Sequence, residues 1–307
     1  MAAECKASGR YPEVHRPRSA AEACGMKAAY GRGGVFIAGG TLLRTQWEAG
    51  TAPMPGALID LTAIPGLDRI SVEADSGKLV IGPLVKLSAL ISSEPVASGF
   101  PLMAEAARRI GAPPVRNLAT IGGNVACRIG DALTALLVYD AELVWQAGER
   151  IDTLRLEDWL ADPGPETDVR LLAGIRLKPP DSAETGGRPG RIVGGFRKLG
   201  RREAFTPSLV TIAVMGRLTE DGTLTGVRVA AGGGSAIPAR LHAAEAVIEG
   251  ARVSPDALVR LSKAAAGEYR PVAGAFAAAD YRCRAAANLI AAEWLTLVGA
   301  AGKEDGP

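Results

Sequence analysis

The segments Ile37-Ala38-Gly39-Gly40-Thr41 and Thr120-Ile121-Gly122-Gly123-Asn124 decide which folds this chain can adopt. Each places two glycines beside an apolar residue and a small hydrogen-bonding side chain. Consecutive glycines let backbone N–H groups converge on an anion because no Cβ atom blocks the approach, and such concave turns bind phosphate. Together, the two turns could hold the diphosphate of a dinucleotide from both sides. One such segment alone is more often a turn that ends a strand, so the pair carries the hypothesis.

The known sequence signatures of other nucleotide-binding folds do not occur in this chain. It contains neither GxGxxG nor GxxxxGK[ST], so the Rossmann and P-loop folds lose their main support. A dinucleotide bound at these turns therefore requires another fold.

The pattern around the two segments predicts an α+β region up to about residue 178. Ser19 is a good N-cap for a helix that ends near Gly31, and a buried strand over 35–38 runs into the first glycine segment. Pro101 opens a helix that Gly111 terminates. Further strands are expected at 57–61, at 70–73 with 79–81 as a hairpin, at 142–156 as a second hairpin, and at 169–177.

A composition shift at 179–190, PPDSAETGGRPG, is typical of a linker. Beyond it the pattern predicts a smaller region with a three-stranded meander followed by three helices. The strands are expected at 192–199, 209–218 and 223–230, and the helices at 240–249, from Ser254 onwards, and at 280–298.

Composition narrows the function classes. The 307 residues carry 35 Lys and Arg against 33 Asp and Glu, and this balance gives no electrostatic basis for wrapping nucleic acid. Two histidines and four widely spaced cysteines predict no metal site in the chain itself. The N-terminus lacks the apolar core of a signal peptide and no apolar run is long enough to span a bilayer, so we expect a cytoplasmic protein.

With its segments in this order, the sequence resembles the FAD-binding medium subunits of the molybdenum hydroxylases, the family that includes carbon monoxide and xanthine dehydrogenases. The most specific match is VRNLATIGGN at 115–124. The other matching segments are IAGGT at 37–41, LIDL at 58–61, EAARRI at 105–110, LLVYDAEL at 136–143, FRKLGRRE at 196–203 and AGGGSAIPAR at 231–240.

The resemblance implies an α+β fold in three parts. A two-part α/β FAD-binding region of the PCMH type would cover residues 1–178, with a boundary between its subdomains near residue 56. After the linker at 179–190, a C-terminal domain over 191–307 would contain a small antiparallel sheet and a three-helix bundle.

The resemblance also assigns the cofactor contacts. FAD would lie extended between the two glycine segments, with Asp131 near its adenosine half. The basic cluster of Arg197, Lys198, Arg201 and Arg202 is either a solvated strand end or a segment that brings Lys198 to the flavin ring. A cation beside that ring favours the anionic reduced form. No catalytic residue and no metal ligand is assigned. The residues implied to bind FAD are Ile37, Ala38, Gly39, Gly40, Thr41, Leu42, Thr120, Gly122, Gly123, Asn124, Asp131, Ile175 and Lys198.

The sequence departs from the family pattern at two places. Leu42 stands where many relatives have an aspartate. Only six residues separate Asn124 from Asp131, so this loop is shorter than is usual in the family, and it contains Cys127 and Arg128. The Cys127 thiol has a structural alternative to a redox role, and Asp131 has one as a helix N-cap.

The function implied is that of the FAD-carrying electron-transfer subunit of a molybdenum hydroxylase. Its partners would be a small subunit with [2Fe-2S] clusters and a large subunit with the molybdenum cofactor, in a dimer of heterotrimers. Electrons would pass from the clusters through FAD to NAD, a quinone or oxygen. Two alternatives stay open: a self-sufficient FAD-dependent oxidoreductase, and a structural subunit that has lost its flavin.

Overall fold

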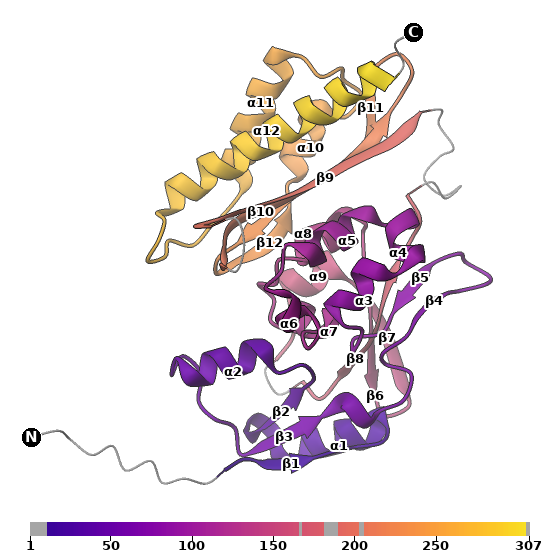
Figure 1. Cartoon of the computed structure of the whole chain (residues 1–307), viewed down its shortest axis with the longest axis vertical. Helices are drawn as coiled ribbons and strands as arrows, with labels where there is room; N and C mark the ends of the chain where they lie inside the picture. Colours follow the sequence, from indigo (N-terminus) through magenta and orange to yellow (C-terminus); the bar gives the residue numbers. More distant parts are fainter. Residues whose placement is uncertain (1–10, 166–167, 181–189, 203–205, 305–307) are drawn as a thin grey trace, which may run out of the picture.

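The computed structural model describes residues 11–165, 168–180, 190–202 and 206–304. Three β-sheets organise these residues (Figure 1). Most of the expected linker at 179–190 lies outside the described residues.

The first sheet is parallel and small. It has the strand order β1-β3-β2, formed by β1 (Glu13–His15), β2 (Gly34–Ile37) and β3 (Ala57–Asp60). Helix α1 (Ala20–Tyr30) packs against it and starts as predicted, with the Glu22 N–H donating to the Ser19 hydroxyl at 3.1 Å. Strand β2 ends in the first glycine segment, and helix α2 (Thr41–Glu48) follows it. Strand β3 starts directly after the predicted subdomain boundary near residue 56 and pairs with both β1 and β2.

The second sheet has five strands in the order β4-β5-β8-β6-β7, and its named pairings are antiparallel. Both predicted hairpins form. The strands are β4 (Ile70–Val72), β5 (Leu79–Ile81), β6 (Glu142–Ala147), β7 (Arg150–Arg155) and β8 (Leu171–Leu177).

Seven short helices accompany this sheet, and the buried apolar residues of all but α6 join it in one hydrophobic core that includes Met103, Ile121 and Leu136. Helix α5 begins at the predicted proline. The helices are α3 (Leu87–Ser92), α4 (Glu94–Gly99), α5 (Pro101–Arg108), α6 (Pro113–Arg116), α7 (Ile121–Ala126), α8 (Leu133–Val138) and α9 (Leu156–Ala161).

The C-terminal domain has an antiparallel sheet of β9 (Arg191–Gly200), β10 (Ser208–Leu218), β11 (Leu224–Gly233) and β12 (Ala236–Arg240). The predicted meander is correct but incomplete, because β12 pairs with β11. Pro238 disfavours a strand in the sequence pattern, and the structure accommodates it at the edge of the sheet. The predicted helices form as α10 (His242–Ile248), α11 (Pro255–Glu268) and α12 (Ala279–Glu304).

The four-stranded sheet is buried on both faces. Ile212 and Val214 lie in a core with Trp294 of α12, whereas Phe196 and Ala213 lie in the core of the second sheet and its helices. Figure 1 shows the three C-terminal helices on one side of this sheet and α5 and α8 on the other. This shared core joins the C-terminal domain firmly to the preceding region.

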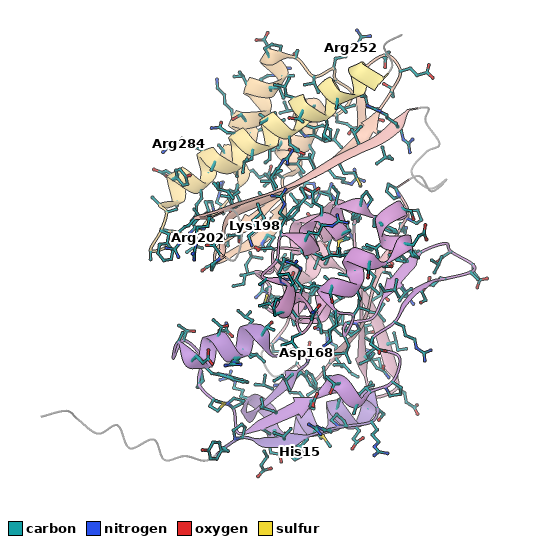
Figure 2. The ribbon with its side chains drawn as sticks, in the orientation of Figure 1. His15, Asp168, Lys198, Arg202, Arg252 and Arg284 are labelled. Atoms are coloured by element: carbon teal, nitrogen blue, oxygen red, sulfur yellow. The ribbon has the colours of Figure 1, made fainter. Side chains whose placement is uncertain are left out.

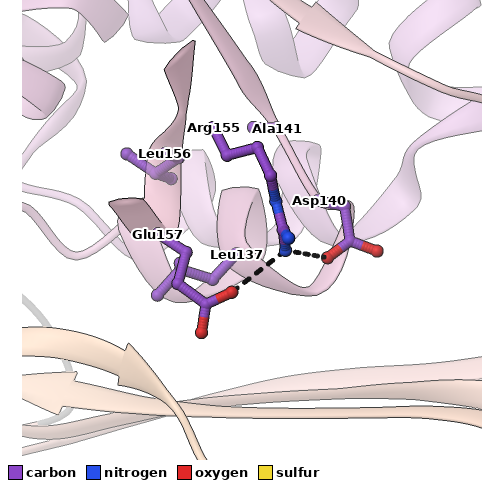
Figure 3. A pocket seen from close by; sticks show the side chains of 6 residues that line it. All are labelled: Leu137, Asp140, Ala141, Arg155, Leu156 and Glu157. Carbon is purple, nitrogen blue, oxygen red and sulfur yellow. Dashed lines mark hydrogen bonds and ion pairs between the residues drawn. The ribbon is translucent and has the colours of Figure 1, made fainter. Parts of the chain in front are cut away.

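An ion-pair cluster at the edge of this interface, centred on Asp140, adds to the shared core. The Asp140 carboxylate accepts hydrogen bonds from Arg228 at 3.0 Å and from Arg240 at 2.5 Å. Arg155 lies between Asp140 and Glu157, 3.7 and 3.0 Å from their carboxylate oxygens (Figure 3). Since Arg228 and Arg240 come from the C-terminal sheet, the cluster connects the two regions.

Candidate functional site

The two glycine segments meet in space. A Cβ atom built on Gly39 would lie 2.0 Å from the Leu118 carbonyl oxygen and 3.1 Å from the Ala119 Cα atom. Real Cβ atoms do not approach backbone this closely, so only glycine lets the first segment contact the residues directly before Thr120. The requirement that the two turns lie together is therefore satisfied.

The first glycine turn presents free hydrogen-bond donors. Gly40 has a φ of +65° and is the N-cap of α2. In the described part of the chain, the N–H groups of Gly39, Gly40, Thr41 and Leu42 donate to no other residue. The first N–H groups of a helix carry partial positive charge and suit an anion. These donors lie at the turn where the diphosphate is expected from the sequence.

The second glycine turn differs from the expectation, because its N–H groups are already used within the chain. Ile121 donates to Val85 at 3.0 Å, Gly122 donates to Pro83 at 2.9 Å, and Gly123 donates to the Thr120 hydroxyl at 3.1 Å. The prediction that free N–H groups converge from both turns is therefore wrong for this turn.

The two glycines of the second turn have different reasons to be glycine. A Cβ atom on Gly122 would lie 2.5 Å from the Pro83 Cβ atom, so Gly122 is required for packing. Gly123 is exposed, and a Cβ atom there would meet only the Thr120 hydroxyl, at 3.2 Å. Of these two glycines, Gly123 presents the backbone surface that a ligand can approach.

The shortened loop after the second turn is fixed by Asn124. Its side-chain oxygen accepts a hydrogen bond from the Ala132 N–H at 3.1 Å, and Gly130 packs against the same side chain. Arg128 adopts a φ of +60°, which is rare for a residue other than glycine, and donates to the Leu160 carbonyl at 2.7 Å. The Asn124 side chain thus stabilises the conformation of this loop.

Cys127 has the properties of a structural thiol. Its Sγ atom lies 3.1 Å from the Asn124 carbonyl oxygen, and burial raises the pKa of the thiol. A raised pKa leaves less of the reactive thiolate at neutral pH. The structure thus favours the structural alternative over a redox role.

Asp131 and Lys198 contact each other directly. The Lys198 Nζ atom lies 2.8 Å from one carboxylate oxygen of Asp131, and only 10% and 13% of the two side chains is exposed. Figure 2 shows Lys198 where the C-terminal sheet meets the helices below it. The family resemblance gave Asp131 and Lys198 to different halves of FAD, whereas the structure joins the two side chains in one ion pair.

Asp131 is also not the N-cap that the sequence suggested. Ala132 occupies the N-cap position of α8 and makes no side-chain capping bond. The second carboxylate oxygen of Asp131 instead accepts a hydrogen bond from the Ser208 hydroxyl at 2.6 Å. Sequence reasoning missed Ser208, and no local motif marks it.

Ile175 is a residue of the hydrophobic core. It is completely buried in β8, where it pairs with Ile81 on one side and Leu143 on the other. A fully buried residue offers no atom to a ligand on the surface, so we attribute its apolar character to the core. Leu42, by contrast, is 41% exposed in the first turn of α2.

The basic segment around Lys198 is divided among several contacts. Arg197 pairs with the buried carboxylate of Glu293, and the Arg201 guanidinium lies 3.7 Å from the ring centroid of Phe276.

Within the described ranges, no group of three His, Cys, Asp or Glu side chains is arranged to hold a metal ion. No described helix is long and apolar enough to cross a membrane.

Residues 7–177, more than half of the 307-residue chain, match the family model described as FAD binding domain in molybdopterin dehydrogenase. The chain belongs to this family. Residues 195–297 match a second model, the CO dehydrogenase flavoprotein C-terminal domain. The two matches follow the two regions that share the core around Phe196.

Similar proteins of known name support the assignment to this family, and some of them match most of the chain. The chain is 28% identical to the nicotine 6-hydroxylase medium subunit of Paenarthrobacter nicotinovorans over 87% of this chain and 90% of that one. It is 40% identical to the carbon monoxide dehydrogenase medium chain of Hydrogenophaga pseudoflava, over 37% and 39% of the two chains. A solved carbon monoxide dehydrogenase from Hydrogenophaga pseudoflava has a chain that superposes with a TM-score of 0.83 at 26% identity, covering 95% of this chain and 98% of that one.

Proposed function

We propose that this chain is the FAD-carrying subunit of a molybdenum hydroxylase complex, in which it accepts electrons from a partner and passes them to an external acceptor. The observation that carries the proposal is the contact between Gly39 and Leu118, beside the unpartnered N–H groups of Gly39 to Leu42. Those donors lie within residues 7–177, the range that matches the FAD-binding family model.

The residues present fit FAD. The N–H groups at the start of α2 would hold the diphosphate, and the exposed backbone of Gly123 would form the opposite wall. Lys198 would offer a donor and a positive charge, held in place by Asp131. When bound, FAD supplies the ability to take up and release electrons singly or in pairs, so the protein has to position it, exclude water and adjust its potential.

The remaining partners belong to the same proposal. A small subunit with [2Fe-2S] clusters and a large subunit with the molybdenum cofactor would supply the other centres, and NAD, a quinone or oxygen would be the acceptor. Relatives named as medium or FAD-binding subunits support a multi-subunit complex. We further propose a dimer of heterotrimers in the cytoplasm.

The self-sufficient oxidoreductase is less well supported by the geometry. It would need a free proton-transferring side chain near the glycine turns, whereas Asp131 and Lys198 are engaged with each other. A structural subunit without flavin would have no ligand for the unpartnered N–H groups at the start of α2.

The visible spectrum of the purified recombinant chain tests the proposal. We expect flavin absorption bands, FAD in the denatured extract, and no turnover of substrate by the chain alone. Co-expression with the neighbouring subunits should yield a complex that contains iron, sulfide and molybdenum. A correctly folded chain that takes up no FAD would refute the proposal, and substrate turnover by the isolated chain would favour the self-sufficient oxidoreductase.

A further inference from the structure

We propose that Ser208, which lies in the C-terminal domain, is a positioning residue of the FAD site and acts by fixing Asp131 against Lys198. This inference rests on the proposed FAD-carrying function and extends it. It gives the C-terminal domain a direct part in binding a cofactor whose glycine turns lie wholly in the preceding region.

The contacts form a short chain across the domain interface. The Ser208 hydroxyl donates to one carboxylate oxygen of Asp131 at 2.6 Å, and Lys198 binds the other oxygen at 2.8 Å. Both carboxylate oxygens of Asp131 are therefore held by groups from the C-terminal sheet. A carboxylate fixed at both oxygens cannot rotate without breaking a charge-assisted hydrogen bond.

Lys198 is fixed in turn and still has capacity for a ligand. Its Nζ atom also donates to the Arg109 carbonyl at 3.0 Å. An ammonium group has three donors, and these two contacts use two of them. The remaining donor is available to FAD, and Asp131 determines where that donor lies.

A β-bulge turns Ser208 toward Asp131. In β10, Val210 pairs with Leu199 and Ser208 with Gly200, so one extra residue lies in β10 between the two pairs. Regular alternation would place Ser208 on the same face as Val210 and Ile212, which pack toward the C-terminal helices. Bulges re-aim side chains, and they occur often beside functional sites.

The glycine triplet at 232–234 orients the hydroxyl. The Gly234 N–H donates to the Ser208 Oγ atom at 3.3 Å, so the Ser208 proton is left to point at Asp131. Gly234 has a φ of +65°, and a Cβ atom there would lie 2.2 Å from the Arg282 guanidinium. This glycine-rich turn thus supports the FAD site through Ser208.

Thr211 in the same strand provides a matched control. It is fully buried, it pairs in register with Lys198, and its hydroxyl has no hydrogen-bond partner within the described residues. Thr211→Val therefore removes a hydroxyl of the same strand and breaks no hydrogen bond.

The test measures the dissociation constant of FAD for the full chain by flavin fluorescence, with the melting temperature as a check of folding. Ser208→Ala should weaken FAD binding about tenfold, because it removes a hydrogen bond to a charged group. Ser208→Thr, which keeps the hydroxyl, should restore most of the affinity, and Thr211→Val should bind FAD like the wild type.

A double-mutant cycle separates positioning from a merely structural role. If Ser208 acts through Asp131, Ser208→Ala adds little to the loss of FAD affinity already caused by Asp131→Ala. Additive losses, or a lower melting temperature of Ser208→Ala with unchanged FAD affinity, would overturn the inference. A wild-type chain that binds no FAD would instead overturn the proposed function, and the inference with it.

Discussion

At the scale of single residues, three of the four glycines of the two turns satisfy three different physical requirements. Gly39 allows backbone to touch backbone, Gly40 adopts a positive φ, and Gly122 packs against Pro83. Gly123 is exposed, and its backbone conformation is open to other residues. A substitution at Gly123 therefore separates ligand binding from folding better than one at the other three.

We expect Gly123→Val to lower FAD affinity at least about tenfold, because the new side chain occupies the surface that the diphosphate approaches. The melting temperature should change only by a few degrees, since helix propensity favours valine over glycine by well under about 1 kcal/mol. Equilibrium dialysis against FAD and thermal unfolding check the two parts. Gly267→Val in α11, where an added Cβ meets nothing within 4 Å, is the control. Full flavin occupancy in the folded Gly123 variant would refute this part of the site.

Cys127→Ser is expected to keep the flavin content of the wild-type chain. The thiol is half-buried, and its Sγ contacts the Asn124 carbonyl, a contact that a serine hydroxyl can also make. The ratio of flavin to protein absorbance measures the outcome. A marked loss of flavin would show that the thiol itself takes part in binding.

At the scale of secondary-structure elements, the site is the meeting of β2–α2 with α6–α7, and Gly39 is the contact point. The boundaries of α1, α5 and the two predicted hairpins follow from caps, prolines and alternation, so local patterns were sufficient for them. The edge strand β12 and the bulge in β10 were missed, because both depend on partners elsewhere in the sheet.

Gly39→Ala should damage folding and FAD binding together. The added methyl group would lie against the Leu118 carbonyl, and relieving that contact requires the two turns to move apart. Overpacking of this kind costs roughly 1–3 kcal/mol of folding free energy. Chemical denaturation followed by circular dichroism measures the loss, and a variant as stable as the wild type would mean that the turns do not touch in solution.

At the scale of the whole molecule, the shared core and the Asp140 cluster hold the C-terminal domain to the preceding region. His242 of α10 adds a contact, with Nε2 lying 2.5 Å from Glu157 of α9 and Nδ1 lying 3.1 Å from Glu245. Partial burial acts to lower the pKa of His242, but the hydrogen bond to Glu157 and the two negative charges outweigh burial and raise the pKa above its ordinary value of 6.5.

A raised pKa in the folded chain fixes the sign of the pH dependence. The protonated histidine stabilises the folded state fully below about pH 6.5, and this contribution is lost as the pH rises through the higher pKa of the folded state. Because the side chain is 58% exposed, the effect should stay below about 1 kcal/mol. Urea denaturation between pH 5.5 and pH 8.5, compared with His242→Gln, measures it. An identical pH dependence in wild type and variant would contradict the assignment.

The sequence alone determined the family, the two hairpins, the three-stranded meander and the position of both glycine turns, because these depend on local patterning and on motifs that stand in a fixed order. Tertiary structure alone decided which N–H groups are free, that Asp131 pairs with Lys198, and that the Ser208 hydroxyl donates to the same carboxylate. The packing of the sheets determines the hydrogen bond between Ser208 and Asp131, which are 77 residues apart, and the face that β10 presents after its bulge. Residue spacing along the chain predicts neither of them.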